Sequence, residues 1–357
     1  MEAERCSGGR VGETSLANPD VLVGLVGGNP VSLLVAAKSL RPRRMVLFAT
    51  EQTQTVADRV VASLGGIPVR VVQWPDVPAI DAFARDAIAD ADLRPTERVV
   101  FDLTGATKTM TVGVWQALLA RGQPFGAVCF MPDGRLVNAR TGVANAGVFL
   151  SAQDHLQLHG YRVRNKRWQG AIDQLPAEFV HRAAVAQHLL NHFGKWHSND
   201  LGWITFKARA PAGPFAAPPP GADKTWIGQN IWLEELALAC AAEACTGGRL
   251  IEASLGLAIQ SGQNQNTNDE SDVVLVRGAR VVVIEAKANQ AGSASGADLQ
   301  KRVQKAESAF GQCRVVFFKP ALSAAAIAGL QPLVPKTDLV AKDLNQLRAA
   351  IARGLGL

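Results

Sequence analysis

Blocks of apolar and polar positions alternate along the first part of the chain. Short runs of consecutive apolar residues predict strands that are covered on both faces, and the segments between them have helical spacing. The predicted strands are 21–28 (VLVGLVGG), 43–50 (RRMVLFAT), 67–74 (IPVRVVQW), 98–104 (RVVFDLT) and two within 124–139 (PFGAVCFMPDGRLVNA). The predicted helices are 30–40, 52–65, 77–92 and 107–122. Repeated strand–helix units indicate an α/β fold with a mostly parallel, doubly wound sheet.

A second α/β region begins near residue 226, with its elements in a different order. A helix is predicted over 226–245 (WIGQNIWLEELALACAAEAC), followed by a strand over 249–260, a hairpin over 272–288, a helix over 296–311 and a strand over 313–319. Ahead of this region, 208–224 (ARAPAGPFAAPPPGADK) has the composition of a linker or an exposed loop. The sequence therefore predicts a polar tail at 1–20, a Rossmann-like domain at 21–148, a helical connector and linker at 149–225, and a second domain at 226–357.

Composition narrows the class of protein. The chain has 357 residues, of which 48% are apolar and 19% charged, as expected for two globular domains. Its net charge of +6 suits a polyanionic partner, although many basic proteins bind no nucleic acid. Five scattered cysteines without a CxxC pair indicate a reduced, cytoplasmic protein without a disulfide framework or a thiolate zinc site. No signal peptide or long uncharged apolar stretch is found, so no membrane association is expected.

The hairpin DVVLVRGARVVVIEAKA, residues 272–288, places charge at the end of buried strands. With Gly278-Ala279 as a two-residue type II′ turn, Asp272 falls directly opposite Glu285. Strand alternation puts Lys287 on the same face as Glu285. Like charges in facing positions destabilise a sheet, so two such carboxylates need a proton, a cation or a metal ion.

Oxygen ligands of this kind suit Mg²⁺ or Mn²⁺. Such an ion would polarise a phosphodiester and help to ionise a water molecule, while Lys287 could orient that water or neutralise charge on phosphorus. Glu234 or Glu235, in the preceding helix, could complete the ion's shell. Neighbouring helical residues diverge by about 100°, so only one of the two can face inward easily. The alternative for the hairpin is an ordinary exposed edge with a Glu–Lys pair.

Two loops of the first domain have the composition of ligand sites. The first follows strand 21–28 and offers Gly27, Gly28 and Asn29, although on its own this stretch is better explained as a plain strand–helix turn. The second, DLTGATKTM, follows strand 98–104 at the carboxyl end of the sheet, where open α/β sheets bind ligands. Its candidate contacts are Thr104, Gly105, Ala106, Thr107 and Lys108. Backbone amides, hydroxyls and a lysine favour an anion, but the GxxxxGK spacing of an NTPase is absent.

The order of elements from 226 to 319 resembles the PD-(D/E)xK nuclease superfamily. A helix with a glutamate precedes a hairpin with an aspartate, then Glu-x-Lys and another helix; Ser271 stands where the family's name has proline. The resemblance implies that Asp272 and Glu285 are metal ligands and that Lys287 is the catalytic lysine. It also implies that Glu234 is the helix carboxylate, with Glu235 as the alternative.

The loop LTGATKT resembles the Thr-Gly-Gly-Thr-Lys signature of CARF domains, the CRISPR-associated Rossmann folds, with Ala106 in place of the second glycine. The GGNP loop matches the family's other ligand loop, and Thr50, after the second strand, would be a further contact. Together the two halves resemble the accessory nucleases of type III CRISPR systems. That resemblance implies a homodimer, activation by cyclic oligoadenylate (cyclic tetra-adenylate above all), and Mn²⁺- or Mg²⁺-dependent cutting of DNA, RNA or both.

Three other functions fit the same residues. One is a constitutive restriction- or repair-type endonuclease whose first domain only dimerises. Another is a nucleotide-responsive nucleic-acid-binding regulator with a purely structural hairpin. In a third, the CARF half also degrades its own ligand, for which Thr104, Thr107 and Lys108 are compatible. The basic segment YRVRNKRW, 161–168, could contact phosphates and stack on bases, or could be a solvated face.

Overall fold

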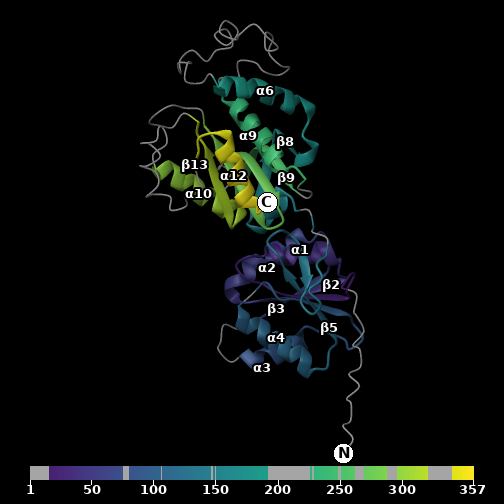
Figure 1. Ribbon diagram of the computed structural model, residues 1–357. Helices are drawn as coiled ribbons and strands as arrows, with labels where there is room; N and C mark the ends of the chain where they lie inside the picture. Colours follow the sequence, from purple (N-terminus) through teal and green to yellow (C-terminus); the bar gives the residue numbers. More distant parts are fainter. Residues whose placement is uncertain are drawn as a thin grey trace, which may run out of the picture. The chain divides into compact units, whose positions relative to one another are not determined.

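The computed structural model contains two compact units (Figure 1). The first comprises Met1–Phe130 with Leu136–Asn145, and the second Met131–Arg135 with Ala146–Leu357. Each unit has its own sheet and its own hydrophobic core. The structure describes residues 16–74, 80–105, 107–145, 148, 150–191, 226, 229–247, 251–261, 269–287, 296–320 and 340–357.

The first unit is built on a six-stranded sheet with the order β3-β2-β1-β4-β5-β6. Its strands are β1 (Val21–Leu25), β2 (Arg44–Ala49), β3 (Val69–Gln73), β4 (Val99–Asp102), β5 (Phe125–Phe130) and β6 (Leu136–Asn138). All neighbours pair in parallel except β5 and β6, which form an antiparallel hairpin. The chain progresses in opposite directions from β1 and β4, so a ligand crevice is expected at their carboxyl ends.

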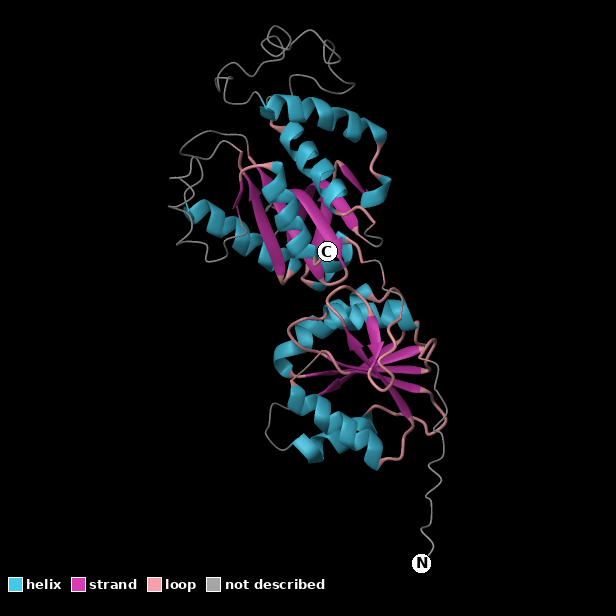
Figure 2. Cartoon of the chain, in the orientation of Figure 1, coloured by secondary structure: helices cyan, strands magenta, loops and turns pink. Residues whose placement is uncertain are grey.

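Helices cover both faces of this sheet (Figure 2). They are α1 (Val31–Leu40), α2 (Gln54–Ser63), α3 (Ile80–Asp90) and α4 (Lys108–Ala120), with the 3-10 turn η1 (Glu51–Thr53) before α2. Every residue of β1 and β4 is buried as a result. The continuous apolar runs of the sequence therefore correspond to strands sandwiched between helices, and the predicted doubly wound fold is confirmed.

The second unit is built on a seven-stranded mixed sheet with the order β13-β12-β11-β10-β9-β7, in which β8 also pairs with β9. Its strands are β7 (Tyr161–Asn165), β8 (Trp168–Ala171), β9 (Glu252–Ser261), β10 (Asp269–Arg277), β11 (Arg280–Ala286), β12 (Cys313–Phe318) and β13 (Val340–Ala341). Its helices are α5 (Ala152–Leu158), α6 (Ala177–Asn191), α9 (Ile231–Ala244), α10 (Gly296–Phe310) and α12 (Leu344–Leu355), with the 3-10 turn η2 (Ile172–Gln174). This is the second α/β fold that the sequence predicts.

The segment predicted as a helical connector differs from that expectation. It contributes α5 and α6, but β7 and β8 lie in it as well and pair with β9 of the second sheet. The polar, charge-rich sequence of β7 hides its strand character, because β7 is an edge strand with exposed arginines. The predicted Pro-rich linker, 208–224, lies outside the described residues.

The β10–β11 hairpin is the rigid centre of the second unit. Its register pairs Leu275 with Val282 and Val276 with Val281, as the sequence predicts. Gly278, in the turn, has a φ of 60°, which glycine adopts at no steric cost. His155 of α5 contacts the carbonyl oxygen of Gly278 at 2.8 Å and holds the turn in place. The valines and isoleucine of both strands are buried, partly against α9 and α12, so the hairpin has little freedom to move.

Candidate active site

The open end of the hairpin places two carboxylates side by side. Val273 and Ile284 are the paired residues farthest from the turn. Asp272 and Glu285 occupy the next positions of the two strands. Both side chains are buried, with 5% and 4% of the residue exposed. The Asp272 carboxylate accepts a hydrogen bond from the Ala286 backbone amide at 2.7 Å. The backbone of one strand thus fixes the acid of the other.

Lys287 lies immediately after β11 and turns back onto Asp272. Its ammonium group donates to the two Asp272 carboxylate oxygens at 3.3 Å and 3.0 Å. The Lys287 backbone amide bonds to the Phe318 carbonyl at 3.0 Å, so the residue is held where β11 meets β12. The predicted set of Asp272, Glu285 and Lys287 therefore lies together in space.

Glu285 has a different partner, which the sequence analysis did not identify. Arg302 of α10 forms an ion pair with the Glu285 carboxylate. Burial, together with the negative charge of Asp272, nevertheless raises the pKa of Glu285 above its ordinary value. The positive charges of Arg302 and Lys287 oppose that shift and stabilise the ionised form. The basic residues of the predicted helix 296–311 were the signal for this contact, but only the fold shows which of them reaches the site.

Only Glu234 of the two candidate helix carboxylates lines the pocket. It sits in the first turn of α9, where the helix dipole stabilises a negative charge, and it pairs with Arg167. Glu235 points elsewhere: it accepts hydrogen bonds from Arg182 at 2.8 Å and 2.9 Å and from the Trp226 indole at 2.9 Å. These contacts satisfy Glu235 inside the core between α6 and α9, so Glu235 has a structural role.

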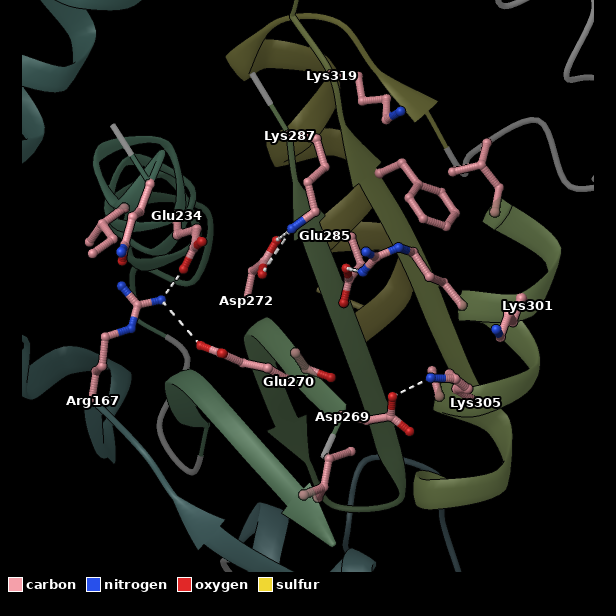
Figure 3. A pocket seen from close by; sticks show the side chains of 18 residues that line it. Arg167, Glu234, Asp269, Glu270, Asp272, Glu285, Lys287, Lys301, Lys305 and Lys319 are labelled. Carbon is pink, nitrogen blue, oxygen red and sulfur yellow. Dashed lines mark hydrogen bonds and ion pairs between the residues drawn. The ribbon is translucent and has the colours of Figure 1, made fainter. Parts of the chain in front are cut away.

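These groups line one pocket with a volume of about 810 Å³ (Figure 3). Its acidic lining residues are Glu234, Asp269, Glu270, Asp272 and Glu285. Its basic lining residues are Arg167, Lys287, Lys301, Arg302, Lys305 and Lys319. No local motif in the sequence marks Asp269, Glu270, Lys305 or Lys319, because they lie on β10, on α10 and just after β12. A pocket with so many basic groups around buried acids suits an anionic ligand such as a phosphodiester.

The donor set suits a hard divalent cation, because it consists of carboxylate oxygens in one pocket. Within the described residues, however, no three or more His, Cys, Asp or Glu side chains are gathered closely enough to hold a metal ion as they stand. In Figure 3 the carboxylates of Asp272 and Glu234 each face a basic group. Asp272 and Glu285 would hold an ion, with Glu234 beside them, once their cationic partners are rearranged.

The predicted ligand loops lie at the carboxyl ends of β1 and β4 in the first unit. The Thr104 hydroxyl accepts a hydrogen bond from the Phe130 amide at 2.8 Å, and the Thr107 hydroxyl caps α4 through the Met110 amide at 3.3 Å. Lys108 is exposed at the start of α4. A Cβ on Gly105 would overlap the Leu25 carbonyl, so this glycine lets the loop approach β1 closely. Ala106 lies outside the described residues.

The other predicted contacts of the first unit have local structural roles as well. Gly27 is half-buried, Gly28 and Asn29 are exposed, and the Asn29 side chain accepts from the Val31 amide at 3.2 Å, which orders the start of α1. Thr50 caps η1 through the Thr53 amide at 3.3 Å. These bonds leave the two loops ordered at one edge of the sheet, where an anionic ligand would meet backbone amides.

One buried acid beneath these loops was not singled out from the sequence. Asp102 ends β4 and has no exposed surface. Burial raises the pKa of Asp102, while hydrogen bonding from Thr104 opposes the shift. The Thr104 amide donates to the Asp102 carboxylate at 3.0 Å. Asp102 therefore helps to fix the backbone of the loop that carries Thr104.

The two units define the fold of the chain: a Rossmann-like α/β unit followed by a mixed α/β unit that carries the pocket. Solved structures share this fold. VC1899 from Vibrio cholerae matches with a TM-score of 0.68 at 15% identity, over 94% of this chain and 97% of its own. Can2 from Sulfobacillus thermosulfidooxidans, solved in complex with cyclic tetra-adenylate, matches with a TM-score of 0.66 at 16% identity, over 94% and 99%.

A third structure, a type III CRISPR defence DNA nuclease activated by cyclic oligoadenylate, matches with a TM-score of 0.54 at 19% identity, over 85% of this chain and 45% of its own. No family model and no curated protein sequence matches the chain. The predicted fold class is thus confirmed, and this chain has the fold of the CARF nucleases. In the part of the chain that the structure describes, no helix has the length and apolar character to span a membrane.

Proposed function

We propose that this protein is a metal-dependent nuclease of type III CRISPR defence that is activated by a cyclic oligoadenylate. The observation that carries the proposal is the meeting of Asp272, Glu285, Lys287 and Glu234 in one pocket within a chain of CARF-nuclease fold. Structures with this fold include one bound to cyclic tetra-adenylate and one described as activated by cyclic oligoadenylate. Cyclic tetra-adenylate is therefore the first ligand to test.

The residues of the pocket have separate roles in this proposal. Asp272 and Glu285 bind Mg²⁺ or Mn²⁺, and Glu234 completes the carboxylate set. The bound ion supplies Lewis-acid polarisation of the phosphodiester and lowers the pKa of a water molecule. Lys287, held against Asp272 at 3.0 Å, orients that water or neutralises the charge that develops on phosphorus. The rigid hairpin keeps these groups in place before substrate arrives.

The first unit supplies the switch in this proposal. The ring would be bound by the loop carrying Thr104, Gly105, Thr107 and Lys108 and by the loop carrying Gly27, Gly28 and Asn29, with Thr50 beside them. A two-fold symmetric ring suits a symmetric homodimer. The ligand can activate only if it binds the active arrangement of the dimer more tightly than the inactive one. The DNA or RNA substrate then meets the carboxylate pocket.

One matrix of nuclease assays tests the proposal. Single- and double-stranded DNA and RNA are incubated with Mn²⁺ or Mg²⁺, with tetra- or hexa-adenylate rings and without a ring. We expect cutting only when both a ring and a divalent ion are present. Equal rates with and without every ring would instead identify a constitutive endonuclease.

The double variant Asp272→Asn/Glu285→Gln identifies the site in the same assay. It should abolish cutting while the protein stays folded. The matched control is Asp269→Asn, which removes a carboxylate from the same pocket that is partly exposed and not a proposed ligand. Cutting by the folded double variant at the parental rate would disprove the metal site. Following a labelled ring over time shows whether the first unit also degrades it.

A further inference from the structure

Each buried carboxylate of the pocket has a cationic partner. The ion pairs are Asp272 with Lys287, Glu285 with Arg302, and Glu234 with Arg167. An ionised carboxylate in a buried site is costly unless it is paired, so these cations stabilise the protein when no metal ion is bound. They also occupy the oxygen atoms that a metal ion would need.

All three cations are more exposed than the acids they hold, and two of them are arginines. The Glu285 side chain is 6% exposed, whereas that of Arg302 is 41% exposed and comes from a separate element, α10. In the same way, the Glu234 side chain is 10% exposed and that of Arg167 is 31% exposed. The acids are therefore fixed in the wall of the pocket, while the guanidinium groups reach in from its rim.

We propose that Arg302 and Arg167 are exchangeable counter-ions. In the metal-free protein they hold Glu285 and Glu234, and once a divalent ion takes over those carboxylates they bind backbone phosphates of the nucleic acid. Guanidinium groups suit both partners, because their planar fork matches carboxylates and phosphates alike. This inference rests on the proposed nuclease function and adds to it two substrate-binding residues and a coupling between metal and substrate.

The charge of the pocket supports the exchange. Its lining has six basic and five acidic side chains, so the field is close to balanced before a metal ion binds. A divalent ion makes it distinctly positive and frees the guanidinium of Arg302. That residue lies in a basic row on α10 with Lys301 and Lys305, which also line the pocket. Nucleic acid should therefore bind more tightly to the metal-loaded protein, and metal more tightly in its presence.

Strand β9 leaves space for the Arg167 side chain to reach the pocket. Gly256 of β9 has a φ of 57°, and a Cβ at this position would overlap the Arg167 guanidinium. The Arg167 amide also donates to the Leu255 carbonyl at 3.0 Å. The sheet thus makes space for one arginine to lie across β9, toward Glu234 and within 4.0 Å of the more exposed Glu270.

The test compares Mn²⁺ binding with nucleic-acid binding in the full chain. Calorimetric titration with MnCl₂ should show that Arg302→Met binds Mn²⁺ roughly 3- to 10-fold more tightly than the parent, because no guanidinium competes for Glu285. Binding of labelled DNA and RNA oligonucleotides is measured with Ca²⁺, which takes the same oxygen ligands. Here the same variant should bind roughly 3- to 10-fold more weakly. Arg167→Met should shift both affinities in the same directions.

Lys305→Met is the matched control. Lys305 lies on the same helix and lines the same pocket, but it pairs with Asp269, which is not a proposed ligand. This variant should weaken oligonucleotide binding and leave Mn²⁺ affinity unchanged. Arg302→Lys keeps the cation beside Glu285 and protects the fold, and its weaker hold should still give tighter Mn²⁺ binding than the parent.

The inference is overturned if Mn²⁺ affinity stays the same or falls in both Arg302 variants, or if it rises equally in Lys305→Met. A parent protein that binds no Mn²⁺ would overturn the inference and the metal-dependent function together. If the affinities shift as expected but no nucleic acid is cut under any condition, the counter-ion exchange stands and the nuclease function alone is wrong.

Discussion

At the scale of single residues, the buried acids of the second unit differ in the groups that surround their carboxylates. Glu235 is enclosed by a doubly hydrogen-bonded arginine and an indole, whereas Glu234, its neighbour in sequence, faces the pocket. An acid whose partners are all buried stabilises the fold. An acid that faces a pocket, beside a partly exposed cation, is available to bind a ligand or take part in catalysis. We therefore expect the two neighbours to have opposite roles.

Substitution by glutamine separates those two roles. Glu235→Gln removes a buried charge that accepts hydrogen bonds from Arg182 and Trp226, so it should lower the free energy of unfolding by about 3 kcal/mol. Glu234→Gln should change unfolding much less and should reduce cutting and Mn²⁺ affinity. Urea unfolding and metal titration of both variants check this. Loss of stability in Glu234→Gln alone would reverse the assignment.

The burial of Asp102 predicts how the stability of the protein depends on pH. Its folded-state pKa is raised by burial, so its contribution to stability is complete below the ordinary pKa of about 3.8 and is lost as the pH rises through the folded-state value. Asp102→Asn keeps the shape and can still accept from the Thr104 amide. The variant should therefore melt at a higher temperature than the parent at neutral pH, with a smaller difference in acid. Melting curves across the pH range measure this, and a lower melting temperature at neutral pH would contradict it.

At the scale of elements, the β10–β11 hairpin follows directly from its sequence, and the β7–β8 ribbon does not. A two-residue turn and strict alternation fix the hairpin register, and with it the facing of Asp272 and Glu285. The ribbon pairs with β9, which lies far along the chain, and its exposed basic residues lack an apolar pattern. Local periodicity cannot encode such a distant partner, so the sequence pattern predicts a connector for this segment and not two strands.

The positive φ of Gly256 in β9 leads to a prediction at this scale. Gly256→Ala should strain the backbone by about 1–2 kcal/mol and also displace Arg167. The control is Gly247→Ala, where φ is 79° and an added Cβ meets nothing within 4 Å. Both variants should lose stability in urea unfolding, but only Gly256→Ala should also alter Mn²⁺ affinity. Equal behaviour in both assays would show that β9 does not guide Arg167.

At the scale of the whole molecule, two units with separate cores carry the two candidate sites. The first presents loops at the carboxyl ends of parallel strands, and the second presents a carboxylate pocket at the end of a buried hairpin. Each site lies where its own sheet ends, because backbone and side-chain polar groups become available there. Binding at each site should therefore stabilise the unit that holds it.

Metal binding should raise the melting temperature of the full chain. An ion that binds only the folded state at about 100 times its dissociation constant adds about 2.7 kcal/mol. Differential scanning calorimetry with MnCl₂ should show a rise that EDTA reverses. The rise should be absent in Asp272→Asn/Glu285→Gln and present in Asp269→Asn. A rise of equal size in the double variant would place the ion elsewhere.

The sequence by itself determined the two α/β folds, the hairpin register, and the grouping of Asp272, Glu285 and Lys287, because strand alternation and a short turn act over a few residues. It also predicted that the two candidate ligand loops lie close together, since parallel strands end at a common edge. Only the tertiary structure decided between Glu234 and Glu235, and only it brought Arg167, 67 residues away in the chain, to Glu234. Such choices depend on which distant elements pack together, and that packing sets which buried charge finds which partner.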